Sequence, residues 1–273
     1  MNSRPRIRLF RARSRLATGI ALAGAAAAAA CAQSQDTDRS EDPAAALADS
    51  LVRVWIDAAG GLEAWEDVRS ARYTVTTVWF DSLGAIRRMR PRRVELRKTA
   101  TGEQSRIERP EAEGLYVQVF TGAGTWATLN DAPLAPDHPA TAESEYVGRD
   151  VFYWFGLPYK LMDPGVNRSA RRLDEGGFEL RITFGDTIGA HPGDRYFYYF
   201  MDDTPHPEEV HYIEQGKEDV NRLMWAEVAA ADPIAYVGRR TYADDEGRLT
   251  KELRIDDVSI NPCIPDSLFE PPR

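Results

Sequence analysis

The sequence predicts a mainly β, α+β fold built on one large antiparallel sheet, and three observations support this prediction. From Ala71 onward, apolar and polar residues alternate with a period of two in one segment after another, as in strands that bury a single face. Turn-forming residues separate these segments. Helical spacing of apolar residues is confined to residues 43–68, which precede these segments, and to one stretch at 142–162 between them. A sheet of roughly nine to eleven strands is expected, which is too many to remain flat and open.

The first element is expected to be a helix. Asp42 and Pro43 supply an N-cap and a first-turn proline, and Gly60-Gly61 supplies a left-handed stop. A short helical turn should follow over residues 62–68. The next expected elements are strands at 71–79, 85–98, 105–109, 115–121 and 125–130, and a proline-rich loop at 131–139.

A second helical region is expected over residues 142–162, interrupted by Pro158. The alternating pattern then returns, with expected strands at 178–184, 195–201, 208–213, 222–231, 234–243 and 248–260. In the last strand, apolar residues occupy odd positions up to Ile255 and even positions from Val258. A β-bulge near Asp256-Asp257 would reconcile the two parities and would bend the sheet.

Residues 1–30 have the layout of a bacterial export signal. Six arginines and no acidic residue precede an apolar run from Leu16 to Ala30. This run of about 15 residues is shorter than the roughly 20 that a membrane-spanning helix needs. We expect cleavage before Cys31 and lipidation of that cysteine; the alternative is an ordinary small-x-small site around Cys31 that releases an unanchored protein. Residues 31–42 then form a polar tether, and residues 43–273 form a single domain.

The charge of the exported product excludes several kinds of partner. Removal of residues 1–30 takes away six of the 34 basic residues and none of the 43 acidic ones. The product has a net charge of about −15, which repels nucleic acid and anionic membrane surfaces. We therefore expect no nucleic-acid partner, and contact with a membrane through the lipid anchor.

Two segments concentrate the aromatic residues, one in the second helical region and one in the strand at 195–201. Because that strand is apolar on both faces, both faces must be covered. A plain packed core explains this pattern, and so does a ligand cavity between the sheet and the helices. If there is a cavity, the candidate lining residues are Trp79, Trp126, Trp154, Phe155, Tyr196, Tyr198 and Trp225.

The strand at 85–98 is strongly basic in an otherwise acidic protein. Its cationic residues are Arg87, Arg88, Arg90, Arg92, Arg93, Arg97 and Lys98. Such a strand could receive an acidic partner or a phosphate headgroup. We favour the simpler interpretation that it is an edge strand or a solvent face, where charge and Pro91 prevent edge-to-edge association.

Motifs for catalysis and for metal binding are absent from the sequence. It has no Gly-x-Ser-x-Gly elbow, no phosphate-binding Gly-Lys-Ser/Thr loop and no dinucleotide fingerprint. Its four histidines lack zinc-ligand spacing. We therefore expect no catalytic residues, no metal and no cofactor, and we rank a hydrolase of envelope material last among the possible functions.

The sequence resembles an uncharacterised family of bacterial exported lipoproteins, which is similar to the periplasmic lipoprotein-carrier (LolA/LolB-like) half-barrel proteins. The most specific matching segment is Leu157-Pro158-Tyr159-Lys160-Leu161-Met162-Asp163-Pro164-Gly165. The other matching segments are Gly60-Gly61-Leu62-Glu63-Ala64-Trp65, Val119–Trp126, Ile182-Thr183-Phe184-Gly185 and Asp266-Ser267-Leu268-Phe269-Glu270-Pro271.

This resemblance implies a half-barrel, in which a strongly curved antiparallel sheet carries a few helices on its concave side. It also implies an apolar groove that receives acyl chains, on the periplasmic face of a membrane, with the outer membrane favoured. The expected function is a tethered lipoprotein that binds a lipid, a lipoprotein acyl chain or another hydrophobic ligand. The alternative is a structural or protein-interaction lipoprotein with a packed core.

Overall fold

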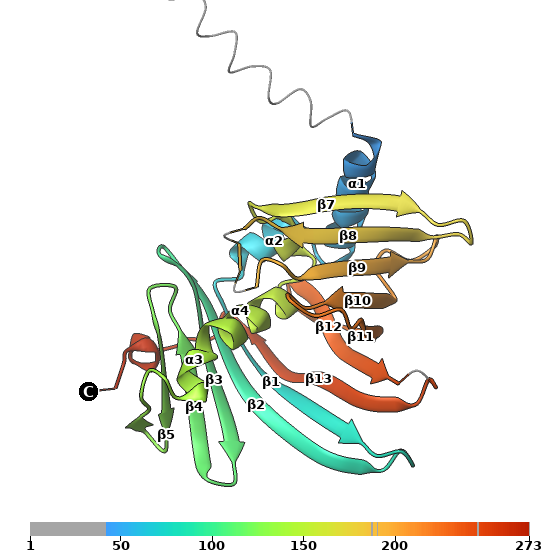
Figure 1. The fold of residues 1–273 in the computed structure, drawn as a ribbon. Helices are drawn as coiled ribbons and strands as arrows, with labels where there is room; N and C mark the ends of the chain where they lie inside the picture. Colours follow the sequence, from blue (N-terminus) through green and yellow to red (C-terminus); the bar gives the residue numbers. More distant parts are fainter. Residues whose placement is uncertain (1–41, 187, 190, 245, 273) are drawn as a thin grey trace, which may run out of the picture. The chain divides into compact units, whose positions relative to one another are not determined.

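The computed structural model describes residues 42–272 except positions 187, 190 and 245, and 13 strands of these residues form a single sheet (Figure 1). The strands are β1 (Ser70–Phe80), β2 (Ile86–Thr99), β3 (Gly102–Glu111), β4 (Gly114–Phe120), β5 (Thr125–Leu129), β6 (Ala132–Pro133), β7 (Val166–Arg172), β8 (Phe178–Phe184), β9 (Arg195–Phe200), β10 (Glu209–Ile213), β11 (Asn221–Ala231), β12 (Ile234–Ala243) and β13 (Leu249–Ile260). The helices are α1 (Pro43–Ala58), α2 (Leu62–Asp67), α3 (Pro139–Ala142) and α4 (Ser144–Phe155), with 3-10 turns η1 (Tyr159–Met162) and η2 (Asp266–Phe269).

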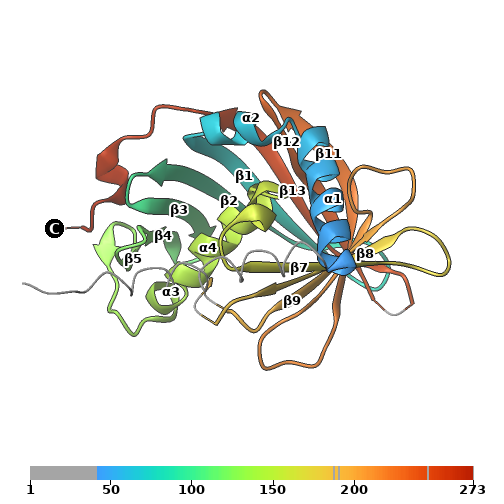
Figure 2. The same ribbon diagram turned by 90° about the horizontal axis from the view of Figure 1, so that it is seen from above.

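The sheet is antiparallel throughout and does not close. Its strand order is β6-β5-β4-β3-β2-β1-β13-β12-β11-β10-β9-β8-β7, so the first and last long strands of the chain pair at its centre. The sheet bends around α1 and α4, as the view from above shows (Figure 2). The predicted fold class, a curved half-barrel with helices on its concave side, is confirmed.

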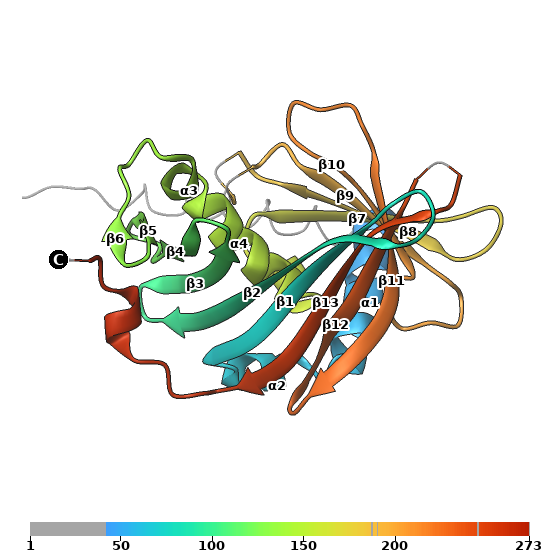
Figure 3. The ribbon, with the colours of Figure 1, turned by 90° about the horizontal axis from the view of Figure 1, so that it is seen from below.

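Two helices cover most of the concave face. Helix α1 packs near β7, and its buried Trp55 contacts the rings of Tyr198 and Trp225 at 5.6 and 5.7 Å between centroids. Helix α4 lies across β3, β4 and β5. It approaches them closely because Gly148 faces Phe120 and Ser105 without a side chain of its own. The view from below shows both helices within the curve of the sheet (Figure 3).

The predicted bulge in the last strand is confirmed. Arg72 pairs with Ser259 and Thr74 with Asp256, so β13 contains one residue more than β1 over this interval. Asp257 takes up the extra residue with a φ of 55°. The extra residue returns the apolar positions of both halves of β13 to the same side of the sheet.

Two strands were not expected, and each has a physical reason. In β7 only Val166 and Ala170 are buried, because β7 is an edge strand and its other residues are polar. Strand β6 has two residues and lies within the predicted loop. The predicted second helix is shorter than expected, because α4 ends at Phe155 and Gly156-Leu157-Pro158 separates it from η1.

The basic strand was predicted to be an edge strand or a solvent face; it is not an edge strand, but its first half, residues 86–93, is largely exposed to solvent. Strand β2 lies between β3 and β1, near the centre of the sheet. Its charges are tolerated there because alternate arginines point to opposite faces of the sheet. One set of arginines lies on the convex face and the other on the concave face.

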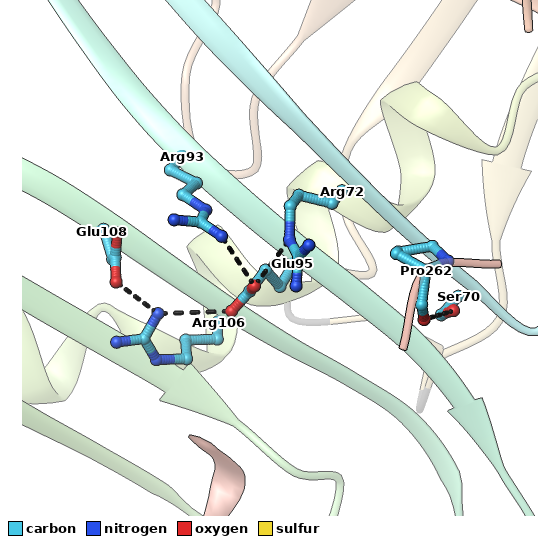
Figure 4. Close-up of polar contacts among 7 residues, drawn as sticks. All are labelled: Ser70, Arg72, Arg93, Glu95, Arg106, Glu108 and Pro262. Atoms are coloured by element: carbon cyan, nitrogen blue, oxygen red, sulfur yellow. Dashed lines mark hydrogen bonds and ion pairs between the residues drawn. The ribbon is translucent and has the colours of Figure 1, made fainter. Parts of the chain in front are cut away.

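On the convex face, arginines surround buried carboxylates. Glu95 is only 1% exposed and lies 2.9 Å from Arg72 Nε, 3.3 Å from Arg106 Nη1 and 3.5 Å from Arg93 Nη2 (Figure 4). Glu252 is equally buried between Arg239 and Arg254. Each of these buried carboxylates therefore has arginines in direct contact.

Candidate functional site

The register of β1 identifies the side chains that face the helices. Tyr73 is buried, and its hydroxyl donates a hydrogen bond to the carbonyl of Val151 in α4 at 3.2 Å. Residues two apart on a strand share a face, so Val75, Thr77 and Trp79 also point to the concave side. Residues directly opposite them on β2 and β13 point the same way.

The structure brings five of the seven predicted lining residues into one aromatic cluster beneath α4 and α1. Trp154 lies 5.9 Å from Tyr196 and 6.3 Å from Trp225, measured between ring centroids. Tyr198 adjoins both Tyr196 and Trp225. Phe155 belongs to the same core and stacks on Tyr73. The five side chains, Trp154, Phe155, Tyr196, Tyr198 and Trp225, are all buried.

The other two predicted lining residues lie elsewhere. Trp79 is half-buried near the end of β1, with the guanidinium of Arg88 5.3 Å from its ring. Trp126 packs with Val117, Val119 and Phe269 in a separate cluster. Gln118 donates to Ala140 of α3, so its neighbours Val117 and Val119 point to the opposite, convex face. We therefore remove Trp126 from the candidate lining.

The interior beneath the helices is filled in the described part of the chain. A pocket of about 90 Å³ beside α4 is lined by residues that include Tyr146, Asp150 and Tyr196. Pockets of about 20 and 10 Å³ lie beside α1 and α2. These volumes are well below the roughly 300 Å³ at which ligand pockets begin. A larger pocket of about 330 Å³, lined by Arg239 and Arg254, is polar and lies where β12 and β13 diverge.

The contact between α3–α4 and the sheet is partly polar. The hydroxyls of Tyr153 and Tyr198 lie 2.7 Å apart. Within the described residues, three buried atoms near this contact have no hydrogen-bond partner: Ser105 Oγ, Thr141 Oγ1 and Trp225 Nε1. Each such atom costs about 1–3 kcal/mol. The helices are therefore held less firmly than an apolar interface of the same area would hold them.

Asp150 carries a carboxylate into this contact. Burial raises its pKa above the ordinary value, although the charges of Arg240 and Arg92 oppose the shift. The carboxylate is thus a counter-charge on α4 for cationic residues of the sheet.

Sequence analysis missed that cationic group on the concave face. Arg88, Arg90 and Arg92 lie opposite Trp79, Thr77 and Val75, and therefore share their face. Arg109, Arg240 and Lys251 join them from β3, β12 and β13. Strict alternation within the basic strand was the signal that could have revealed the group, because every second arginine had to face the same side as Tyr73.

Searches among known proteins find similarity at the level of structure only. No protein-family model matches the sequence, and no curated protein does. A DUF1329 family protein from Desulfovibrio piger aligns over 82% of this chain and 97% of its own, with a TM-score of 0.52 and 12% identity. A LolA superfamily protein from Nitrosomonas europaea aligns over the same shares, with a TM-score of 0.51 and 11% identity. This chain has a LolA-like fold.

A third structure, a putative outer membrane lipoprotein-sorting protein domain from Vibrio parahaemolyticus, aligns over 75% of this chain and 90% of its own, with a TM-score of 0.46 and 9% identity. The predicted resemblance to lipoprotein-carrier half-barrels is confirmed for the fold. These identities carry no site residue from those proteins to the LolA-like chain.

Two further findings apply to the part of the chain that the structure describes. No helix there is both long and apolar enough to span a bilayer. No three or more His, Cys, Asp or Glu side chains gather there in a way that could hold a metal ion. The predicted export signal, and Cys31 with it, lies outside the described residues.

Proposed function

We propose that this LolA-like protein binds a hydrophobic or amphiphilic ligand on the concave face of its sheet, beneath and beside α4. The observation that carries the proposal is the aromatic cluster formed by Trp154, Tyr196, Tyr198 and Trp225, held under a helix whose contact with the sheet leaves buried polar atoms unpaired. Rings of this kind give an acyl chain a large apolar contact area.

Binding requires α4 to move, because the pocket beside it holds only about 90 Å³. Burial of an acyl chain offsets the lost helix contacts, at about 0.8 kcal/mol for each CH₂ group removed from water. The unpaired atoms at the interface reduce the cost of separating α4 from the sheet. The ligand thus takes the place of the α4 side chains on the aromatic cluster.

The proposal also includes attachment of the domain to a membrane. Lipidation of Cys31 and a tether over residues 31–42 would hold the domain that follows at the periplasmic face of a bacterial membrane, and the outer membrane is our first choice. A Cys31→Ser variant is expected to move from the membrane fraction to the soluble periplasmic fraction. A variant that remained with the membrane would contradict the anchor and would leave ligand binding to be judged separately.

Mass spectrometry of the protein purified from an exporting host tests ligand binding. We expect co-purified lipid, and an increase in melting temperature when a fatty ligand is added to delipidated protein, since ligands that bind only the folded state stabilise it. A protein that carries no lipid and whose melting temperature does not respond would contradict the proposal.

The filled interior favours a second candidate function. With pockets of about 90, 20 and 10 Å³ beneath the helices, the domain could serve as a structural or protein-interaction lipoprotein that needs no ligand. The same thermal titration distinguishes the two functions, because a permanently packed core gains nothing from a fatty ligand.

A further inference from the structure

The concave face carries a cationic surface beside the aromatic cluster. It consists of Arg88, Arg90, Arg92, Arg109, Arg240 and Lys251, and we call it the cationic ledge. Its lower part lies where β1, β2 and β13 run on past α4 (Figure 1). Here Trp79 faces Arg88 on one side and Lys251 on the other.

Nearby carboxylates do not neutralise the positive charge of the cationic ledge. Among the described residues, Glu111 pairs with Arg90 at 2.6 Å and lies near Arg88 and Arg109. Asp150 and Glu214 are further acidic groups within electrostatic reach of the ledge. The six cations of the ledge thus outnumber these three carboxylates, in a protein whose overall charge is negative.

Two arginines of the ledge, Arg240 and Arg92, have no carboxylate in direct contact in the described part of the chain. Arg240 is 6% exposed, and its guanidinium carbon lies 4.2 Å from the Trp154 ring centroid. Arg92 Nε is buried and has no hydrogen-bond partner there. Burial of a cation without a hydrogen-bonded partner is costly.

The cations of the ledge also repel one another, which disfavours their charged forms. Burial lowers the pKa of Arg92, and the charges of Arg240 and Arg109 lower it further while Asp150 opposes them. Burial and the Arg240 charge likewise lower the pKa of Lys251. On the convex face, by contrast, Glu95 and Glu252 each sit between arginines in direct contact. The buried carboxylates of the convex face thus have arginines in direct contact, whereas Arg92 and Arg240 on the concave face have no carboxylate in direct contact among the described residues.

We propose that the ledge binds the anionic headgroup of an amphiphile, with a phosphate or carboxylate placed between Arg92, Arg240 and Lys251. This inference rests on the proposed function and specifies its ligand class. Charge-assisted hydrogen bonds from guanidiniums suit such a group, and a bidentate fork matches its oxygens.

The geometry also gives the ligand an orientation. Arg240 lies against Trp154 and opposite Trp225, so a headgroup on the ledge directs its chain into the aromatic cluster. Asp150 reaches the same cations from α4. An arriving anion would replace this carboxylate as their counter-charge when α4 moves aside.

Titration calorimetry of the full chain with three probes tests the inference. The probes are dodecyl phosphate, dodecyl maltoside as a neutral molecule with the same chain, and inorganic phosphate. We expect dodecyl phosphate to bind at least about tenfold more tightly than the maltoside, which is the scale of one charged hydrogen bond. Added salt should reduce this preference.

Charge variants localise the effect. Arg92→Gln with Arg240→Gln should remove most of the preference for the phosphate head, and Arg88→Gln with Lys251→Gln should reduce it at more exposed positions. The matched control is Arg93→Gln with Arg97→Gln, which removes two charges from the other face of the same strand β2. The control should bind both dodecyl probes as the unaltered chain does.

The outcomes separate this inference from the proposed function. Equal binding of both dodecyl probes, unchanged in all variants, would overturn the headgroup assignment and leave the hydrophobic site standing. If neither dodecyl probe bound, both proposals would fail. If inorganic phosphate bound as tightly as dodecyl phosphate, the ledge would be a site for free anions, and the amphiphile assignment would be wrong.

Discussion

Gly148 sets the distance between α4 and the sheet. A Cβ atom at this position would lie 2.6 Å from Phe120 Cβ and 2.6 Å from Ser105 Oγ. Both atoms belong to strands of the sheet, so a side chain at this position would push α4 away from β3 and β4. A single missing side chain therefore keeps the concave face covered.

Gly148→Ala should destabilise the protein by about 1–3 kcal/mol, because overpacking outweighs the usual gain of alanine in a helix. Urea unfolding measures the change. Gly124→Ala is the matched control, since its Cβ would meet nothing within 4 Å. Equal stability of the two variants would show that α4 does not rest closely on β3 and β4.

The hydroxyls of Tyr153 and Tyr198, 2.7 Å apart, form a polar link between α4 and β9. Tyr198→Phe should cost about 1–2 kcal/mol, because it leaves the Tyr153 hydroxyl without its partner. Adding Tyr153→Phe should cost little more, and a double-mutant cycle by urea unfolding measures this coupling. Strictly additive losses would mean that the two hydroxyls do not interact.

Asp150 should make stability depend on pH. Its pKa in the folded protein lies above the ordinary value of 3.8, so the folded state binds more protons than the unfolded state between these two values. Stability therefore falls as pH rises through this interval. Arg92 and Arg240 oppose the shift, whereas Asp194 supports it.

In Asp150→Asn this contribution is absent. We expect the variant to gain stability relative to the unaltered chain as pH rises from about 4, and the difference to level off below that pH. Urea unfolding between pH 3.5 and 8 measures it. If Asp150→Asn instead lost stability relative to the unaltered chain as pH rises, the cations would stabilise the Asp150 carboxylate more than burial destabilises it.

At the scale of elements, hydrophobic periodicity predicted where the strands lie in the sequence. It did not predict their order in the sheet. The alternation in β1, the parity change in β13 and the glycine stop after α1 are local features, and the structure confirms them. The position of β2 depends on pairing between distant segments, which no local pattern encodes. Strand β7 was missed because an edge strand has little apolar alternation to display.

The candidate site was predicted in the same uneven way. Aromatic density predicted Trp154, Tyr196 and Tyr198 as lining residues, and the structure places their rings together; residues two apart on β9 share a face. Their contact with a ligand stays a prediction. Trp126 was misplaced because the sequence does not reveal which face of β5 is concave. The cationic ledge was not predicted, because the basic strand was interpreted as a single charged segment. The alternation of its arginines between two faces was not considered.

The segment that contains η2 covers the convex face and should be independent of the ligand site. Phe269 packs on Val117 and Val119, with Arg97 4.0 Å from its ring centroid. Phe269→Ala should lower stability by about 2–4 kcal/mol in urea unfolding. It should leave the affinity for an acyl ligand unchanged, and a large loss of affinity would contradict the separation of the two faces.

At the scale of the whole domain, a sheet that bends without closing determines what the protein can do. Its concave face needs a cover, and α1 and α4 supply one with little room to spare. The cover combines aromatic rings with incompletely paired polar atoms, and it borders a surface where cations outnumber carboxylates. This combination suits a ligand with an apolar chain and an anionic headgroup.

Quenching of tryptophan fluorescence by an alkyl phosphate brominated in its chain tests the central claim most directly, because bromine quenches only the rings that it approaches. We predict strong quenching in the unaltered chain, a clear loss of quenchable signal in Trp225→Phe, and no such loss in Trp126→Phe on the convex face. Absence of quenching, or quenching lost only in Trp126→Phe, would show that no acyl chain enters the concave face.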